Sequence, residues 1–188
     1  MSRTNNPRAR QNGFVLIAGL LILIVVTLLS VSIFRSLGLQ ERIAGNTREK
    51  QRALEAAQSA LQYGEWWLNL GNAGTGVGCT SVANANVKSE MKVCDKVLAN
   101  PAALPWAARA DYQPPEMTVK SGGGLAASGD INYWAKPGLH IYYLGLGPDS
   151  KSLVYQVSAF GYGGSKTAAA VVQSVYQIKP GNFALDAP

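Results

Sequence analysis

Apolar side chains are concentrated in one long run near the N-terminus of the chain. Residues 14–34 contain no charged residue, and their only polar side chains are Thr27, Ser30 and Ser32. A helix rises about 1.5 Å per residue, so this run reaches about 30 Å, the thickness of the apolar core of a bilayer. Hydroxyl side chains can bond a carbonyl one turn earlier, so lipid tolerates them. The pattern predicts a transmembrane helix over residues 14–34.

From residue 35 the pattern changes to one apolar face on a polar helix. Ala, Leu, Gln, Glu and Arg dominate this stretch, and all of them favour helix. Gly71 is the expected end of the helix. We therefore expect an amphipathic continuation over residues 35–70. The side chains expected to face the rest of the protein lie three or four positions apart: Leu54, Ala57, Leu61, Gly64 and Leu68.

Residues 71–188 are expected to form a globular domain in two parts. Gly, Asn and Pro interrupt residues 71–130, which predicts a loop-rich part with a short helix at 87–99. Residues 131–179 contain strand patterns at 138–147, 152–159 and 167–178, separated by glycine-rich turns. Strands joined by short turns predict an antiparallel β-meander. A long helix packed on one face of this small sheet gives an α+β fold.

The charge and the two cysteines indicate where the domain resides. Arg3, Arg8 and Arg10 precede the apolar run, and no acidic residue occurs before Glu41, so the N-terminus should stay in the cytoplasm and the C-terminal domain should be exported. Cys79 and Cys94 would then meet oxidising conditions. Their even number and the lack of a CxxC motif favour one disulfide, with two free buried thiols as the alternative.

Candidate chemistry is sparse in this sequence. His140 is the single histidine and lies within a strand pattern, and four Cys/His ligands for a structural zinc ion are not present. The lysines of residues 71–188 are scattered rather than clustered, so the net charge of +6 gives little support for nucleic-acid binding. We therefore expect no enzymatic activity, no catalytic residue, no metal, no cofactor and no small-molecule substrate.

The start of the apolar run suggests a processing site. An ordinary signal peptide has a shorter apolar core and a small-residue cleavage site after it, whereas charged residues follow this run. An uncleaved signal anchor remains an alternative. The Gly13-Phe14 junction between a basic leader and the apolar run resembles the signal of type IV pilins and pseudopilins. The resemblance implies that prepilin peptidase removes residues 1–13 and methylates Phe14, and it implies a pilin-like fold.

One position departs from the pattern of the pilin family. Most pilins have Glu as the fifth residue after the cut, and this chain has Ala18 there. In the family this Glu pairs with the terminal amine of the adjacent subunit. In the family its absence marks a particular minor subunit, so the departure favours a tip or priming role over membership of the bulk filament, because no subunit lies beyond the tip.

A second motif narrows the resemblance to one branch of the family. Residues 37–61 are similar to PilX-type pilus assembly proteins, whose ERxAGN-like segment precedes an alanine-rich helix. The positions that match this segment are Glu41, Arg42, Ala44, Gly45 and Asn46. The resemblance implies a minor pilin of a tip or priming complex, located in the bacterial inner membrane and then at the pilus tip. Implied partners are inner-membrane lipid, prepilin peptidase, other minor pilins, the major pilin and a tip adhesin.

Interface candidates follow from the same resemblance and from aromatic content. They are Glu41, Arg42, Trp66 and Trp67. Neighbouring residues cannot share one helix face, so one tryptophan could face a partner, although core packing of both is favoured. Two related alternatives remain, a tip pseudopilin of a type II secretion system and a DNA-binding minor pilin for DNA uptake. The sequence does not separate priming of assembly from presentation of an adhesin.

Overall fold

A computed structural model describes residues 14–119 and 132–179. The chain forms two units, Met1–Gly45 and Asn46–Pro188. Helix α1, Phe14–Trp67, contributes residues to both. The expected leader, with Gly13 at its end, lies outside the described residues.

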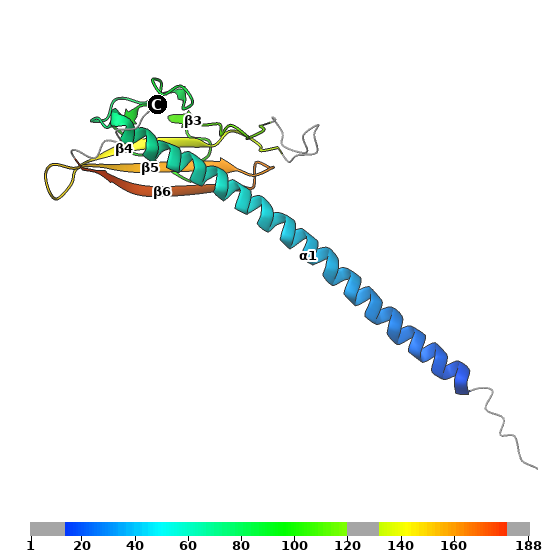
Figure 1. Ribbon diagram of the computed structural model, residues 1–188. Coiled ribbons are helices and arrows are strands. Elements are labelled where there is room, and N and C mark those ends of the chain that lie inside the picture. The colour runs from blue at the N-terminus through cyan, green and yellow to red at the C-terminus, as the bar shows by residue number, and fades with distance from the viewer. Residues whose placement is uncertain (1–13, 120–131, 180–188) are drawn as a thin grey trace, which may run out of the picture. The chain divides into compact units, whose positions relative to one another are not determined.

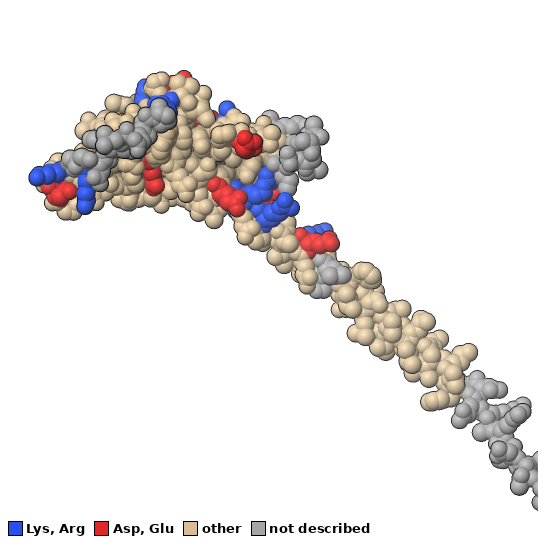
Figure 2. Space-filling view, viewed as in Figure 1, with Lys and Arg blue, Asp and Glu red and all other residues tan. Residues whose placement is uncertain are grey.

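In the first unit, α1 carries the apolar run. Its most apolar window has a mean hydropathy of 3.1, so the helix is long and apolar enough to cross a membrane by length and composition. Thr27 Oγ1 donates to Ile24 O at 2.8 Å and Ser30 Oγ to Val26 O at 2.8 Å, so these hydroxyls are satisfied within the helix. Figure 2 shows this run as surface without charge.

In the second unit, α1 ends in a wide turn at the predicted position. A π-helical turn, η1, covers Leu68–Asn72, and Gly71 within it has a φ of 87°. Glycine takes this left-handed conformation without the steric cost that a Cβ adds. The end of the helix predicted at Gly71 is therefore confirmed.

Three long antiparallel strands form the body of the sheet (Figure 1). They are β4, Gly138–Leu146; β5, Leu153–Tyr162; and β6, Ala169–Ile178. Ile141 lies opposite Val157, and Val157 opposite Ser174, which fixes the register across the three strands. They match the three strands predicted from the sequence, and the α+β fold with one long N-terminal helix is confirmed.

Three short strands extend the sheet beyond β4 and were not predicted. They are β1, Val82–Asn84; β2, Val93–Cys94; and β3, Arg109–Asp111. The order is β1-β3-β4-β5-β6, and β2 pairs separately with β4. The expected helix at residues 87–99 is wrong, because a turn and β2 occupy that stretch. Backbone pairing with β4 satisfies its peptide groups instead.

The helix packs on the sheet through small side chains. Ala53, Ala57 and Ala60 are fully buried, whereas Leu54, expected on this face, is 40% exposed. A Cβ atom at Gly161 of β5 would lie 2.6 Å from the Ala53 carbonyl oxygen, so the two backbones are in close contact. The expected stripe is thus wrong at Leu54, whereas Ala57, Gly64 and Leu68 are buried as predicted, and most of the buried face is alanine.

We predict that Gly161→Ala lowers the free energy of unfolding by about 1–3 kcal/mol, the usual cost of overpacking a core. The added methyl would meet α1 backbone atoms, which cannot rotate away. Urea unfolding of the full chain in detergent, followed by circular dichroism, measures this change. Gly74→Ala is the control, because a Cβ there meets nothing within 4 Å. Equal unfolding midpoints for both variants would contradict the close contact.

Candidate functional site

The apolar side chains of the first unit form a candidate contact surface along α1. Phe14 is 78% exposed and Leu16 is 73% exposed, and the other large residues up to Phe34 are also exposed. Ala18 lies on this helix, where it presents no carboxylate. An apolar surface of this kind is stable in lipid or against other apolar helices, but not in water.

The interface candidates fall in different parts of the chain. Glu41 and Arg42 are exposed residues of α1 in the first unit. Trp66 and Trp67 belong to the second unit, and their surroundings differ. Trp67 is 4% exposed and its Nε1 donates to Lys88 O at 3.0 Å, so it is a core residue and not a contact for a partner.

Trp66 keeps an accessible face. It is 40% exposed, its ring centroid lies 5.2 Å from that of Tyr63, and Lys88 Nζ lies 4.9 Å above its ring. The expectation that both tryptophans pack in the core is therefore wrong for Trp66. Its amphipathic ring and its exposure suit a contact with another protein.

Polar side chains of α1 hold the turn between β5 and β6. The Glu49 carboxylate accepts hydrogen bonds from Gly164 N and from Arg52 Nη1, the latter at 3.0 Å. Lys50 Nζ donates to Ala169 O at 3.1 Å. Sequence reasoning missed this anchor. Its only signal was the glycine-rich turn at 161–164, which lets the backbone come close to the helix.

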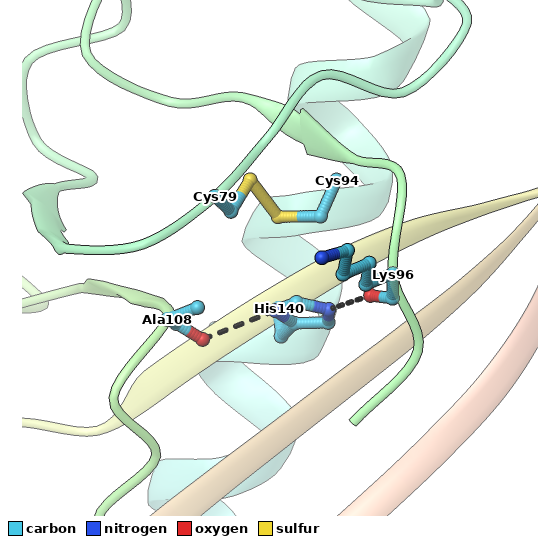
Figure 3. The surroundings of a disulfide bond; sticks show 5 residues. All are labelled: Cys79, Cys94, Lys96, Ala108 and His140. Atoms are coloured by element: carbon cyan, nitrogen blue, oxygen red, sulfur yellow. Dashed lines mark hydrogen bonds between the residues drawn. A yellow bond between two sulfur atoms is a disulfide. The ribbon is translucent and has the colours of Figure 1, made fainter. Parts of the chain in front are cut away.

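The disulfide ties the loop after α1 to the sheet. Cys79 and Cys94 are bonded with a Cα–Cα distance of 5.4 Å (Figure 3). Val77 N donates to Val93 O at 2.8 Å, and Asp95 N donates to Val77 O at 3.0 Å. The predicted disulfide is present and adds a covalent link to these backbone bonds.

His140 of β4 has a structural position. It is 4% exposed, its Nδ1 lies 3.0 Å from Ala108 O and its Nε2 lies 3.0 Å from Lys96 O (Figure 3). Both ring nitrogens therefore face backbone carbonyls, one just after β2 and one just before β3. These contacts hold the buried imidazole between two backbone segments.

A cavity of about 380 Å³ lies beside the disulfide and His140. Thr80, Glu90, Lys92 and Arg109 contribute to its lining. Arg109 Nε donates to Asp111 Oδ1 at 2.6 Å and its Nη1 to Trp106 O at 2.7 Å, so this guanidinium is already engaged. Within residues 14–119 and 132–179, no three His, Cys, Asp or Glu side chains gather to hold a metal ion.

The shifted pKa values belong to structural groups. Burial raises the pKa of Tyr155 to about 12, with a further contribution from Tyr143. Hydrogen bonds from the Ser152 side chain and backbone lower the pKa of Asp149 to about 2. Tyrosine stays neutral and aspartate stays charged at neutral pH, as they ordinarily do. These shifts therefore provide no acid or base for catalysis near pH 7.

Comparison with known families gives one match. Residues 12–62 match the family model described as PilX N-terminal. This match confirms the resemblance of the N-terminal segment to PilX-type pilins, and it includes Glu41 and Arg42. No curated protein and no solved structure matches the chain.

We predict that loss of the disulfide destabilises the second unit by about 3 kcal/mol, the value of the chain-entropy model for a loop of about 15 residues. Urea unfolding of the full chain in detergent, with and without dithiothreitol, measures the loss. The double variant Cys79→Ser/Cys94→Ser should have the stability of the reduced protein, and dithiothreitol should not change that stability. Unchanged stability on reduction would contradict the prediction and would mean that the backbone hydrogen bonds hold this loop without the disulfide.

The two tryptophans should differ in their effect on stability. Trp67→Ala should lower the free energy of unfolding by about 3–5 kcal/mol, because it leaves a cavity in the core. Trp66→Ala should lower it by about 1 kcal/mol, the scale of an exposed cation–π contact. Urea unfolding of both variants tests this difference. A loss at Trp66 as large as the loss at Trp67 would contradict the exposed position.

Proposed function

From the PilX-type segment at residues 12–62, we propose that the chain is a minor pilin of a type IV pilus. It would belong to the tip complex that initiates assembly of the filament and presents an adhesin. The family match is the observation that carries this proposal. The exposed apolar helix and the α+β fold support it, because a pilin needs a membrane-spanning helix and an exported domain.

The apolar run would serve in two environments. Before assembly, lipid of the inner membrane would cover residues 14–34. During assembly, the same side chains would pack against helices of neighbouring pilins. When the helix leaves lipid and packs against other helices, its apolar side chains stay in apolar surroundings, so the hydrophobic effect contributes little. The fit of the side chains and their charges would therefore decide which helices associate.

Ala18 supports a place at the tip. A carboxylate inside the apolar run costs a few kcal/mol in the bilayer unless a positive charge compensates it. A subunit at the tip has no neighbour ahead of it to supply a terminal amine. Ala18 avoids the cost of a carboxylate in the bilayer. It also lacks the carboxylate that would pair with the terminal amine of a subunit already in the filament.

Contacts with other minor pilins would use exposed residues of α1. Glu41 and Arg42 carry opposite charges on the first unit, and Trp66 offers a partly exposed aromatic ring on the second. Charged pairs set register and orientation, whereas aromatic residues contribute binding energy. We propose no reaction for this protein, because both nitrogens of His140 face backbone carbonyls.

We predict that prepilin peptidase processes the chain between Gly13 and Phe14. Intact mass spectrometry of protein recovered from membranes should give a chain that begins at methylated Phe14, only in cells that contain the peptidase. A Gly13→Glu variant should keep its leader in the same cells, because the bulky charged side chain would block the cut. A chain that retains residues 1–13 with the peptidase present would instead be a signal anchor, contrary to this proposal.

A further inference from the structure

Strand β6 is the outermost strand of the sheet on the side opposite β1 (Figure 1). It has ten residues and contains neither a charged residue nor a proline. Natural edge strands are usually short, or carry lysine or proline, because an open edge can pair with another chain. The opposite edge follows this rule, since β1 has three residues. The open edge of β6 therefore requires an explanation.

The hydrogen bonds at the ends of β6 show which of its residues face outward. Gly163 N donates to Ala168 O at 2.7 Å, so residue 168 directs its carbonyl toward β5. In an antiparallel ladder, alternate residues bond to opposite neighbours. Residues 170, 172, 174, 176 and 178 thus pair with β5. The odd-numbered residues of β6 direct their N–H and C=O groups away from the sheet.

The outward carbonyl of Ala169 has a side-chain partner, so the open edge begins after this residue. Lys50 Nζ donates to the carbonyl oxygen of Ala169 at 3.1 Å. Within the described part of the chain, the outward backbone groups of the next four odd positions have no backbone partner. These positions are Val171, Gln173, Val175 and Gln177. Their side chains are also exposed, Val175 by 71%.

Positive charges stand at both ends of this edge. Lys50 lies at the Ala169 end, and the exposed Lys179 follows Ile178 at the other end. The nearby carboxylate of Glu65 accepts a hydrogen bond from Ser174 Oγ at 2.6 Å, on the face covered by α1. The residues of β6 itself are therefore uncharged, the Glu65 carboxylate borders the strand at Ser174 on the helix face, and lysines stand at both ends of the edge.

The basic ends disfavour pairing with a second copy of the chain. An antiparallel pair of β6 strands that uses all four open positions sets Val171 opposite Gln177 and Gln173 opposite Val175. The same register sets Lys179 of one copy opposite Ala169 of the other, beside Lys50. Lysines would meet at both ends, and like charges across strands destabilise pairing.

We propose that residues 171–177 of β6 accept an extended segment of a different protein as an additional strand. The segment would be uncharged over about seven residues, with β-forming side chains, and would have an acidic residue at each end. Main-chain hydrogen bonds would supply affinity, and the two lysines would select the acidic ends. This inference goes beyond the minor pilin assignment and stands if that assignment fails.

The experiment uses the full chain in lipid nanodiscs and the peptide acetyl-DTVTVTVTD-amide as the probe. Amide hydrogen exchange, read residue by residue by NMR, reports on the open edge. The peptide should slow exchange at Val171, Gln173, Val175 and Gln177 at least about tenfold, because each amide gains a partner. The even-numbered amides, already bonded to β5, should change less. The peptide acetyl-KTVTVTVTK-amide should bind at least about tenfold more weakly.

Two substitutions at one position separate backbone pairing from side-chain contact. Val175→Pro removes an outward N–H that the ladder with β5 does not use, so the fold should persist and peptide binding should fall at least about tenfold. Val175→Thr keeps the N–H and the branched side chain, so binding should stay within about threefold of the original. Circular dichroism checks the fold, and exchange in the unaltered chain remains informative if the proline variant does not fold.

Other results would overturn the proposal. Equal binding of the acidic-ended and basic-ended peptides, or no binding, would remove the proposed selectivity. Protection of the four odd-numbered amides in the protein alone would also contradict it. Protection that rises with protein concentration would mean that a second copy covers the edge. Protection independent of concentration would mean that another segment of the same chain does so.

Discussion

The close contact between the alanine face of α1 and strand β5 fixes the sheet of the second unit to its helix. With Ala53 and Ala57 on one side and Gly161 on the other, no large side chain separates the two backbones. This short distance allows Glu49 to reach the turn at Gly164. At the far end of the interface, Trp67 and Leu68 fill the core with larger groups. The helix therefore packs along residues 46–72 without help from the apolar run before them.

The two units consequently divide two physical tasks. The second unit buries its own apolar side chains, and the disulfide reinforces a modest core. The first unit leaves its apolar side chains exposed, so its stability depends on lipid or on other helices. Under the proposed function, this division would let the second unit keep its fold while the surroundings of the first unit change from lipid to neighbouring helices.

Features set by strong local patterns could be predicted from the sequence. The uncharged run, the helix end at Gly71, the three long strands and the cysteine pair all belong to this group. Features set by tertiary contact could not. Leu54 has the hydrophobic side chain that a sequence pattern selects for a buried face, but only small side chains such as alanine fit against Gly161. Strand β2 has only two residues, too few to show the alternation that predicts a strand, and its pairing with β4 is a tertiary contact. The Glu49 anchor and the open edge of β6 depend on which segments meet in space.

The proposed place of this chain is the tip of a pilus rather than its shaft, and Ala18 is the residue that favours it. Quantitative mass spectrometry of intact, unsheared pili from preparations of several mean lengths, measured by electron microscopy, tests this place most directly. A subunit at the tip should be present in one or a few copies per intact filament, whatever the length of the filament. A copy number that rises in proportion to length would place the chain along the shaft and contradict the account.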